Sequence, residues 1–253
     1  MSKSTSLFSA LFCTFIWGTT FIAQDTGMDK IGPLTFNATR FFVGFLTIIP
    51  FALLFEKKKI TKEINNNKQL FYKMLFWVGL FLFLGTYLQQ AALLYTDVAN
   101  AAFFTIFYVP MVPIILFFFY SKSIHWSIWP SALFCIVGVY LLSDFSDATV
   151  RLGDSLVILC ALFWALHIIF IGNFIKNFNL PLFFGALQAL VVSFFSFVFA
   201  LFFETITIPN ILNESVSIIY AGILSGGVAF TLQIYAQKNI SSAPAAIIFS
   251  LEG

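Results

Sequence analysis

The chain has 253 residues, of which 60% are hydrophobic and only 9% are charged, and its formal net charge is +2. About a quarter of the residues of a soluble domain are charged, so this composition excludes that class, and so small a net charge gives no reason to expect a nucleic-acid partner. Apolar runs of about 18 or more residues recur along the whole chain, each long enough to cross a ~30 Å hydrocarbon core as a helix. We therefore predict an all-α polytopic membrane protein embedded in a lipid bilayer.

The apolar runs predict eight membrane spans and the start of a ninth. In chain order they cover about 6–24, 33–55, 70–89, 94–119, 126–143, 155–174, 181–203 and 215–236, with the ninth run beginning near 242. Pro110 and Pro113 are expected to kink the fourth span. The most basic loop is 56–69, and an acidic loop holds Asp144, Asp147, Arg151 and Asp154.

Lys and Arg residues in the loops predict the orientation, because basic loops resist translocation across the membrane. If the N-terminus is cytoplasmic, most of the 13 basic residues fall on the inner side. That inner set is Lys3, Lys57, Lys58, Lys59, Lys62, Lys68, Lys73, Lys122, Lys176 and Lys238. We therefore expect a multi-pass protein of the cell (cytoplasmic) membrane whose N-terminus faces the cytoplasm.

Two sequence echoes predict an internal duplication. A shift of 144 places sets Tyr87-Leu88-Gln89 against Thr231-Leu232-Gln233, and a shift of 147 sets the Cys13–Trp17 stretch against Cys160–Trp164. The repeated unit then holds five spans, and an odd number forces the two copies into opposite orientations, as in many secondary transporters. We predict a ten-helix, 5+5 inverted-repeat architecture, with one repeat in 1–143 and an incomplete second repeat in 144–253 that stops within helix 9.

Several stretches, taken in order, resemble the EamA-like transporters of the drug/metabolite transporter superfamily. They are FIWGTTFIAQ, FNATRFFVG, GTYLQQAALLYTDVANAAFF, GDSLVILCALFWALHIIFIG and GGVAFTLQIYAQKNISSAPAAIIFSLE. The resemblance implies a central cavity lined mainly by spans 1–4 and 6–9, and movement of small organic solutes, with export as the favoured direction. The family usually continues Ser-Leu-Glu-Pro where this chain has Gly253 after Glu252.

Polar groups within spans are costly in lipid and are therefore candidates for function. The candidates for the substrate cavity are Trp17, Thr20, Arg40, Gln89, Asn100, Phe104, Tyr108, Trp164, His167, Gln188 and Gln233. Arg40 either contacts an anionic substrate or serves as an outer lock, by reaching outward or pairing with Asp25 or Asp97. The glutamines and Asn100 could equally hold helices together.

Glu252 and His167 are the candidates for proton coupling. A carboxyl near mid-bilayer could exchange protons or act as a structural acceptor between helices, and a histidine could carry a proton or stay neutral on a fixed partner. Residue 108, a tyrosine, is the repeat mate of Glu252 at a shift of 144.

No enzyme, cofactor or metal signature is present in the sequence. Cys13, Cys135 and Cys160 all lie within apolar segments, and no phosphate-cradling loop, metal-binding motif or nucleophile elbow occurs. We expect a secondary transporter working by alternating access on a small-molecule substrate. A non-transporting membrane scaffold and, less favoured, an integral-membrane enzyme are the alternatives, and homo-oligomerisation stays open.

Overall fold

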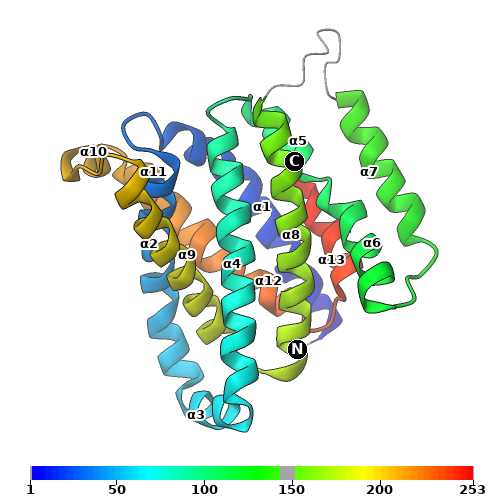
Figure 1. Ribbon diagram of the computed structural model, residues 1–253. Coiled ribbons are helices and arrows are strands. Elements are labelled where there is room, and N and C mark those ends of the chain that lie inside the picture. The colour runs from blue at the N-terminus through cyan, green and yellow to red at the C-terminus, as the bar shows by residue number, and fades with distance from the viewer. Residues whose placement is uncertain (1, 143–151, 253) are drawn as a thin grey trace.

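The computed structural model describes residues 2–142 and 152–252, and every regular element within these ranges is helical. Asp144, Asp147 and Arg151 of the predicted acidic loop lie outside them. The long helices stand side by side as a bundle (Figure 1). Their bounds in chain order are α1 Lys3–Thr26, α2 Pro33–Phe55, α3 Lys57–Asn66, α4 Lys68–Ala92, α5 Val98–Thr105, α6 Tyr108–Tyr120, α7 Ile128–Leu142, α8 Leu152–Asn177, α9 Pro181–Phe203, α10 Ile208–Asn213, α11 Ser215–Tyr220, the π-helix η2 Ala221–Ala229, α12 Phe230–Ala236, α13 Ser242–Phe249 and the 3₁₀ turn η3 Ser250–Glu252.

Seven helical segments of the described chain are long and apolar enough to cross a membrane. Three are α1, α2 and α4, and three more are Val98–Tyr120, α8 and α9. The seventh, Ser215–Ala236, runs through α11, η2 and α12. The predicted fifth and ninth spans are present as shorter apolar helices, Ile128–Gly138 and Ser242–Glu252. These findings confirm a polytopic all-α membrane protein, whereas the ten-helix architecture stays a prediction.

The N-terminus of α2 is capped by a glutamate that follows α9. One carboxylate oxygen of Glu204 accepts from the backbone N–H of Leu34 at 2.8 Å, and the other from the N–H and the hydroxyl of Thr35, at 2.8 and 2.6 Å. The first-turn N–H groups of a helix have no partner within it, and the dipole there favours an anion. A Cβ atom at Gly32 would lie only 2.3 Å from the Glu204 carboxyl carbon, so glycine makes room for this cap.

The N-terminus of α9 is capped in the same way by the glutamate that follows α2. Glu56 accepts from the N–H groups of Leu182 and Phe183, at 3.2 and 2.8 Å. Because each helix ends beside the start of the other, α2 and α9 run antiparallel. Both helices have 23 residues and begin with proline, and each capping glutamate directly follows its helix, 148 places from the other.

Among the remaining long helices, helices of the first half of the sequence pack against helices of the second half. Helix α1 packs against η2 and α12, and α4 packs against α8. The side-chain amide of Gln90 donates to the Gln24 carbonyl at 2.7 Å, and that of Gln237 to the Ile168 carbonyl at 2.8 Å. The donor of the second bond lies 147 residues after that of the first, and the acceptor lies 144 residues after. The largest apolar core cluster lies between these pairs and includes Cys13, Leu82, Ala161 and Val192.

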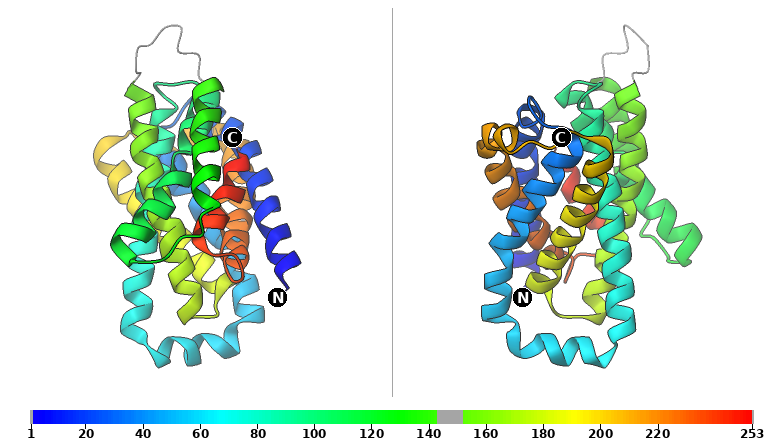
Figure 2. Two further views of the ribbon diagram at one scale, coloured as in Figure 1. Left: turned by 90° about the vertical axis from the view of Figure 1, so that its right-hand side faces the viewer. Right: turned by 60° about the vertical axis from the view of Figure 1, so that its left-hand side comes forward.

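The basic loop predicted at 56–69 is mostly helical, which corrects the sequence interpretation. Helix α3 crosses between the ends of α2 and α4 (Figure 2). Ile60 and Ile64 lie one turn apart and pack against the core, while Lys57, Lys58 and Lys62 are exposed. A helix this short and polar forms because its apolar residues share one face with a packing partner.

The predicted fourth span is broken into α5 and α6 at residues 106–107. Pro110 lacks the N–H that would bond to the Ile106 carbonyl, and that carbonyl accepts instead from the Val109 N–H at 2.8 Å. The break confirms the expected kink and places Tyr108 at the start of α6.

The eighth span contains the nine-residue π-helix η2, which the sequence gave no reason to expect. Gly222, Gly226 and Gly227 let its backbone reach α2 directly, since a Cβ atom on Gly44 would lie 2.6 Å from the Gly226 carbonyl carbon. Small residues allow such close contacts between helices in membranes, and π-helical segments are frequent at functional sites.

Candidate functional site

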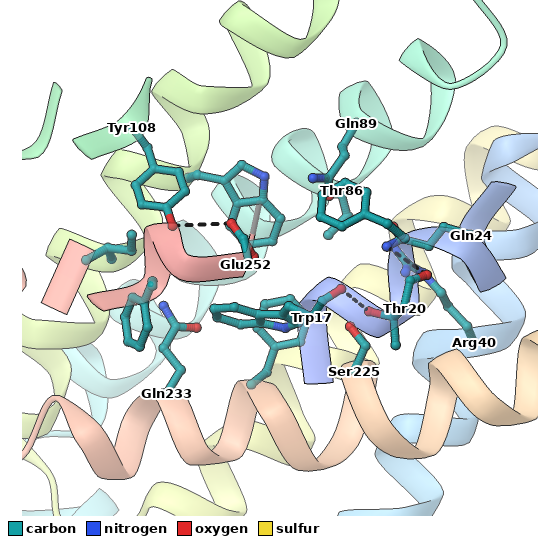
Figure 3. A pocket seen from close by; sticks show the side chains of 15 residues that line it. Trp17, Thr20, Gln24, Arg40, Thr86, Gln89, Tyr108, Ser225, Gln233 and Glu252 are labelled. Carbon is teal, nitrogen blue, oxygen red and sulfur yellow. Dashed lines mark hydrogen bonds between the residues drawn. The ribbon is translucent and has the colours of Figure 1, made fainter. Parts of the chain in front are cut away.

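A cavity with an empty volume of about 440 Å³ lies inside the bundle. Water-molecule centres can occupy about 30 Å³ of it, which leaves room for few waters, since one needs about 10–15 Å³. Its lining residues come from both halves of the chain (Figure 3) and are Trp17, Thr20, Phe21, Gln24, Arg40, Thr86, Gln89, Tyr108, Trp164, Ile168, Ser225, Phe230, Gln233, Phe249 and Glu252. Helix α9 contributes no residue to this lining, whereas the resemblance implied a lining drawn mainly from spans 1–4 and 6–9.

Aromatic rings form one wall of the cavity. The rings of Trp17 and Trp164 lie 6.3 Å apart between centroids, and Phe230 packs against both, at 5.2 and 5.8 Å. Phe249 meets Trp17 edge-on at 5.6 Å. The two tryptophans are separated by 147 residues, so the structure brings the matched positions of the two sequence echoes together. Such a wall offers flat apolar contact to a solute.

A second matched pair meets at another part of the cavity. The Tyr108 hydroxyl donates to a carboxylate oxygen of Glu252 at 3.2 Å (Figure 3), and these positions are 144 residues apart. A Cβ atom on Gly18 would lie 3.0 Å from the Glu252 carbonyl oxygen, so glycine lets η3 lie close against α1. Glu252 therefore presents its carboxyl to the cavity with a neutral hydroxyl as its hydrogen-bond partner.

Arg40 supplies the positive charge of the cavity. Its side chain is only 2% exposed, its Nε donates to Asn37 Oδ1 at 2.8 Å, and its guanidinium lies over the rings of Phe41 and Phe36, at 4.9 and 5.4 Å. Within the described ranges no carboxylate forms an ion pair with it, so the predicted pairing with Asp25 is not seen. Figure 3 shows Arg40 and Glu252 on opposite sides of the cavity.

Several buried polar atoms in the lining have no hydrogen-bond partner among the described residues. They are the indole nitrogens of Trp17 and Trp164, the Gln24 side-chain oxygen, and both amide atoms of Gln233. Buried polar groups without partners are costly, and native structures usually satisfy them with water or a ligand. These atoms offer both donors and acceptors to a polar solute.

Four predicted residues lie outside this lining. His167 does not line the cavity; its Nε2 lies 3.1 Å from Gln188 Oε1, and the imidazole meets Trp164 and Phe230 edge-on. Phe104 packs on the core near Ala92 and stacks with Phe107 at 6.1 Å. Asn100 is half-buried on α5 and does not line the cavity.

Seven lining residues were not predicted from the sequence. They are Phe21, Gln24, Thr86, Ile168, Ser225, Phe230 and Phe249. Gln24 and Thr86 fall one helical turn from the predicted Thr20 and Gln89, so helical spacing would have found them. Ser225 reaches the cavity through the π-helix, for which the sequence holds no clear signal.

Comparisons with known proteins give the family of this chain. The sequence profile of the EamA-like transporter family matches residues 4–144 and again residues 151–253. The chain belongs to the EamA-like transporter family. An uncharacterized transporter from Archaeoglobus fulgidus is 32% identical to this EamA-like chain over 241 residues, which cover 94% of the chain and 71% of that protein.

Two further proteins resemble the EamA-like chain at lower identity. The uncharacterized transporter YoaV of Bacillus subtilis is 23% identical over 251 residues, covering 92% of this chain and 80% of its own. A protein of known crystal structure superposes with a TM-score of 0.75 at 17% identity, over 99% of this chain and 85% of its own, and so shares the fold. The family and the names of both relatives indicate a membrane transporter rather than an enzyme.

Proposed function

We propose that this EamA-like protein is a secondary transporter that moves small organic metabolites across the cytoplasmic membrane by alternating access, with export as its direction. The substrate class is supported by one observation, the buried cavity with a guanidinium that no described carboxylate pairs with on one side and a carboxyl on the other (Figure 3). The cavity holds only a few waters in this conformation, so it must widen on binding; a solute carrying both a carboxylate and an amine would then satisfy Arg40 and Glu252 at once. A scaffold would need no such polar cavity.

Arg40 is the residue that we assign to the solute carboxylate. Removing a charge from water is expensive unless a partner compensates for it, and the described protein residues offer Arg40 one neutral hydrogen bond and two aromatic faces. A bound carboxylate would supply that partner with bidentate geometry. The apolar part of the solute would lie against Trp17, Trp164 and Phe230.

Alternating access is proposed from the way the two halves are interlocked. The reciprocal glutamate caps hold α2 and α9 antiparallel, and the matched tryptophans meet between the halves. In inverted-repeat transporters one half rocks against the other around a central site. With the Lys-rich end of the bundle facing the cytoplasm, the N-terminus lies inside, as basic loops predict.

Glu252 is proposed as the proton-coupling residue, since it is the cavity carboxyl and its hydrogen-bond partner is a neutral hydroxyl. Its hydrogen-bond partner is Tyr108, and the thiols of Cys13 and Cys160 lie close enough to interact with its charge, with Arg40 across the cavity (Figure 3). His167 is a weaker proposal for this role, because it does not line the cavity and one of its ring nitrogens is bonded to Gln188.

The test is solute flux from proteoliposomes containing the full-length protein, with and without an imposed pH gradient. Radiolabelled amino acids are compared with amines that lack a carboxylate. We expect gradient-dependent flux of the amino acids, and loss of the gradient dependence in Glu252→Gln but not in Glu214→Gln, which changes a buried carboxyl outside the cavity. Absence of flux for every solute would contradict the transporter proposal, and gradient-dependent flux in Glu252→Gln would remove its coupling role.

A further inference from the structure

A second cavity lies at the Lys-rich end of the bundle, and its residues belong to three connections. Lys122 and His125 come from the segment between α6 and α7, Lys176 from the last turn of α8, and Gln237 and Ser242 from the segment around the α12–α13 turn. Water-molecule centres can occupy about 440 Å³ of it, against about 30 Å³ in the central cavity. None of its lining residues lines the central cavity.

The cavity concentrates positive charge without a compensating acid. Two lysines and a histidine line it, and its described lining includes no Asp or Glu. Partial burial lowers the pKa of the Lys122 amine, and the nearby positive charge of Lys176 lowers it further. Two cations held this close repel each other, and a bound anion would relieve that repulsion.

Two further groups at the cavity lack protein partners. Helix α13 begins there, and its N-cap residue, Ser241, makes no side-chain capping bond. Ser242 and Ala243 line the cavity, and their first-turn N–H groups have no partner within the helix, whereas Pro244 has no N–H. Gln237 is only 5% exposed, and its side-chain oxygen has no hydrogen-bond donor among the described residues. This oxygen requires a donor, whereas the lysines require an anion.

We propose that this cavity binds a phosphate ester that also carries a hydroxyl group. Lys122, Lys176 and the α13 N-terminus would hold the phosphate oxygens, and the ligand hydroxyl would donate to the Gln237 side-chain oxygen. A soluble sugar- or glycerol-phosphate and the headgroup of an anionic glycerophospholipid share this chemistry. This proposal does not depend on the transport proposal, because its test measures ligand binding and requires no flux.

The competing explanation is that these lysines only follow the general excess of basic residues in loops on one side of a membrane. Lys122 also lies over the Tyr120 ring at 5.6 Å, a contact that needs no ligand. A matched pair of lysines outside the cavity separates the two explanations. Lys57 and Lys58 of α3 are exposed at the same end of the bundle and do not line the cavity.

The experiment uses full-length protein in nanodiscs of phosphatidylcholine. Binding of glycerol 3-phosphate is measured as the rise in the protein's thermal denaturation midpoint. We expect saturable binding that weakens at least about tenfold in Lys122→Gln/Lys176→Gln, since two charge-assisted bonds to the phosphate are lost. Lys57→Gln/Lys58→Gln should bind like the wild type. Methyl phosphate, which has no hydroxyl, should bind about two- to tenfold more weakly than glycerol 3-phosphate, because it leaves Gln237 without a donor.

A second arm tests the lipid source by native mass spectrometry of protein taken from phosphatidylglycerol-containing membranes. Glycerol 3-phosphate binding that depends on Lys122 and Lys176 assigns the site to soluble esters. Retention of phosphatidylglycerol with the same dependence, but no soluble binding, assigns it to a headgroup. The variant Lys122→Arg/Lys176→Arg keeps both positive charges and should keep whichever binding the wild type shows. It is the control that distinguishes loss of charge from misfolding caused by substitution at these two positions. Binding to neither ligand, or equal loss in the α3 control, would overturn the proposal.

Discussion

The Glu204→Gln substitution should destabilise the protein measurably, because it alters the cap that joins the end of α9 to the start of α2. Glu204 accepts three hydrogen bonds there, two from backbone N–H groups and one from a hydroxyl. Glutamine keeps one acceptor oxygen but turns an NH₂ donor toward an N–H donor, so at least one bond is lost and the others lose their charge. Bonds to charged groups contribute about 1.5–3 kcal/mol and neutral ones about 0.5–1.5, and the helix dipole adds about 0.3–1.

The one lost bond and the lost dipole interaction alone sum to about 2–4 kcal/mol in the free energy of unfolding, or roughly 4–16 °C in the midpoint of thermal denaturation for a chain of this size. The assay is thermal denaturation of detergent-solubilised protein, with the folded protein that remains at each temperature measured by size-exclusion chromatography. Glu63→Gln is the control, because Glu63 accepts a single, longer bond of 3.3 Å from the exposed Asn179 N–H. A Glu204→Gln midpoint within 1 °C of the wild type would refute the reasoning.

The matching cap at Glu56 gives a ranked expectation. Burial raises the pKa of Glu56 above its ordinary value of 4.5, although the N–H groups of Phe183 and Leu182 and the charge of Lys238 act in the opposite direction. Since its charged form is already penalised, Glu56→Gln should cost less than Glu204→Gln at neutral pH. A carboxyl whose pKa is raised in the folded state contributes its full stability at pH values below its ordinary pKa. This contribution is lost as the pH rises through the raised pKa of the folded state. The loss of stability in Glu56→Gln relative to the wild type should therefore shrink as the pH rises between these two pKa values.

Four further outcomes follow from the same contacts. The two cap substitutions should be additive in denaturation midpoint, because a 23-residue helix keeps them about 35 Å apart. Gly32→Ala should reproduce much of the Glu204→Gln loss in that assay, since its Cβ atom would displace the carboxylate. Gly44→Ala should lower the midpoint strongly because it meets the backbone of η2, whereas Gly138→Ala, with no atom within 4 Å, should have little effect. His167→Asn should cost about 1–2 kcal/mol in stability through the lost bond to Gln188, yet leave the pH dependence of flux unchanged; a changed pH profile would return His167 to the proton path.

Span positions could be read from the sequence because hydrophobic length is a strong local signal. The second and seventh spans were predicted with the bounds that α2 and α9 have. The kink in the fourth span also followed from Pro110, because a missing N–H is a local property. The helical state of α3 was missed, since Ile60 and Ile64 are its main apolar contacts and depend on a partner surface that only tertiary structure provides.

The reciprocal caps held a sequence signal that a longer comparison would have found. At a shift of 148, the stretch FALLFE before residue 57 matches FALFFE before residue 205. That alignment pairs Glu56 with Glu204, and Arg40 with Gln188. It would have shown that the guanidinium has a neutral counterpart, and that the cavity is therefore unequal in charge between the two sequence halves.

The cavity itself was only partly predictable. Trp17, Trp164 and Tyr108 were found because positions matched by the sequence echoes meet in space. His167 and Gln188 were nominated for their polarity, but polarity alone does not distinguish a side chain that faces a cavity from one that bonds to its neighbour. The rotation of each helix about its own axis decides this, and the π-helical turns of η2 change that rotation without a clear sequence signal.

The most direct test of the account is the flux of carboxylate-bearing solutes through Arg40→Gln. Glutamine is the residue found at the matched position 188. Removing a buried charge that pairs with no carboxylate of the described residues should leave the protein at least as stable as the wild type. We predict that flux of amino acids in proteoliposomes falls at least about tenfold, while Lys30→Gln, a change in the α1–α2 loop, has no effect. Unchanged amino-acid flux in a folded Arg40→Gln protein would contradict the assignment of the cavity as the substrate site.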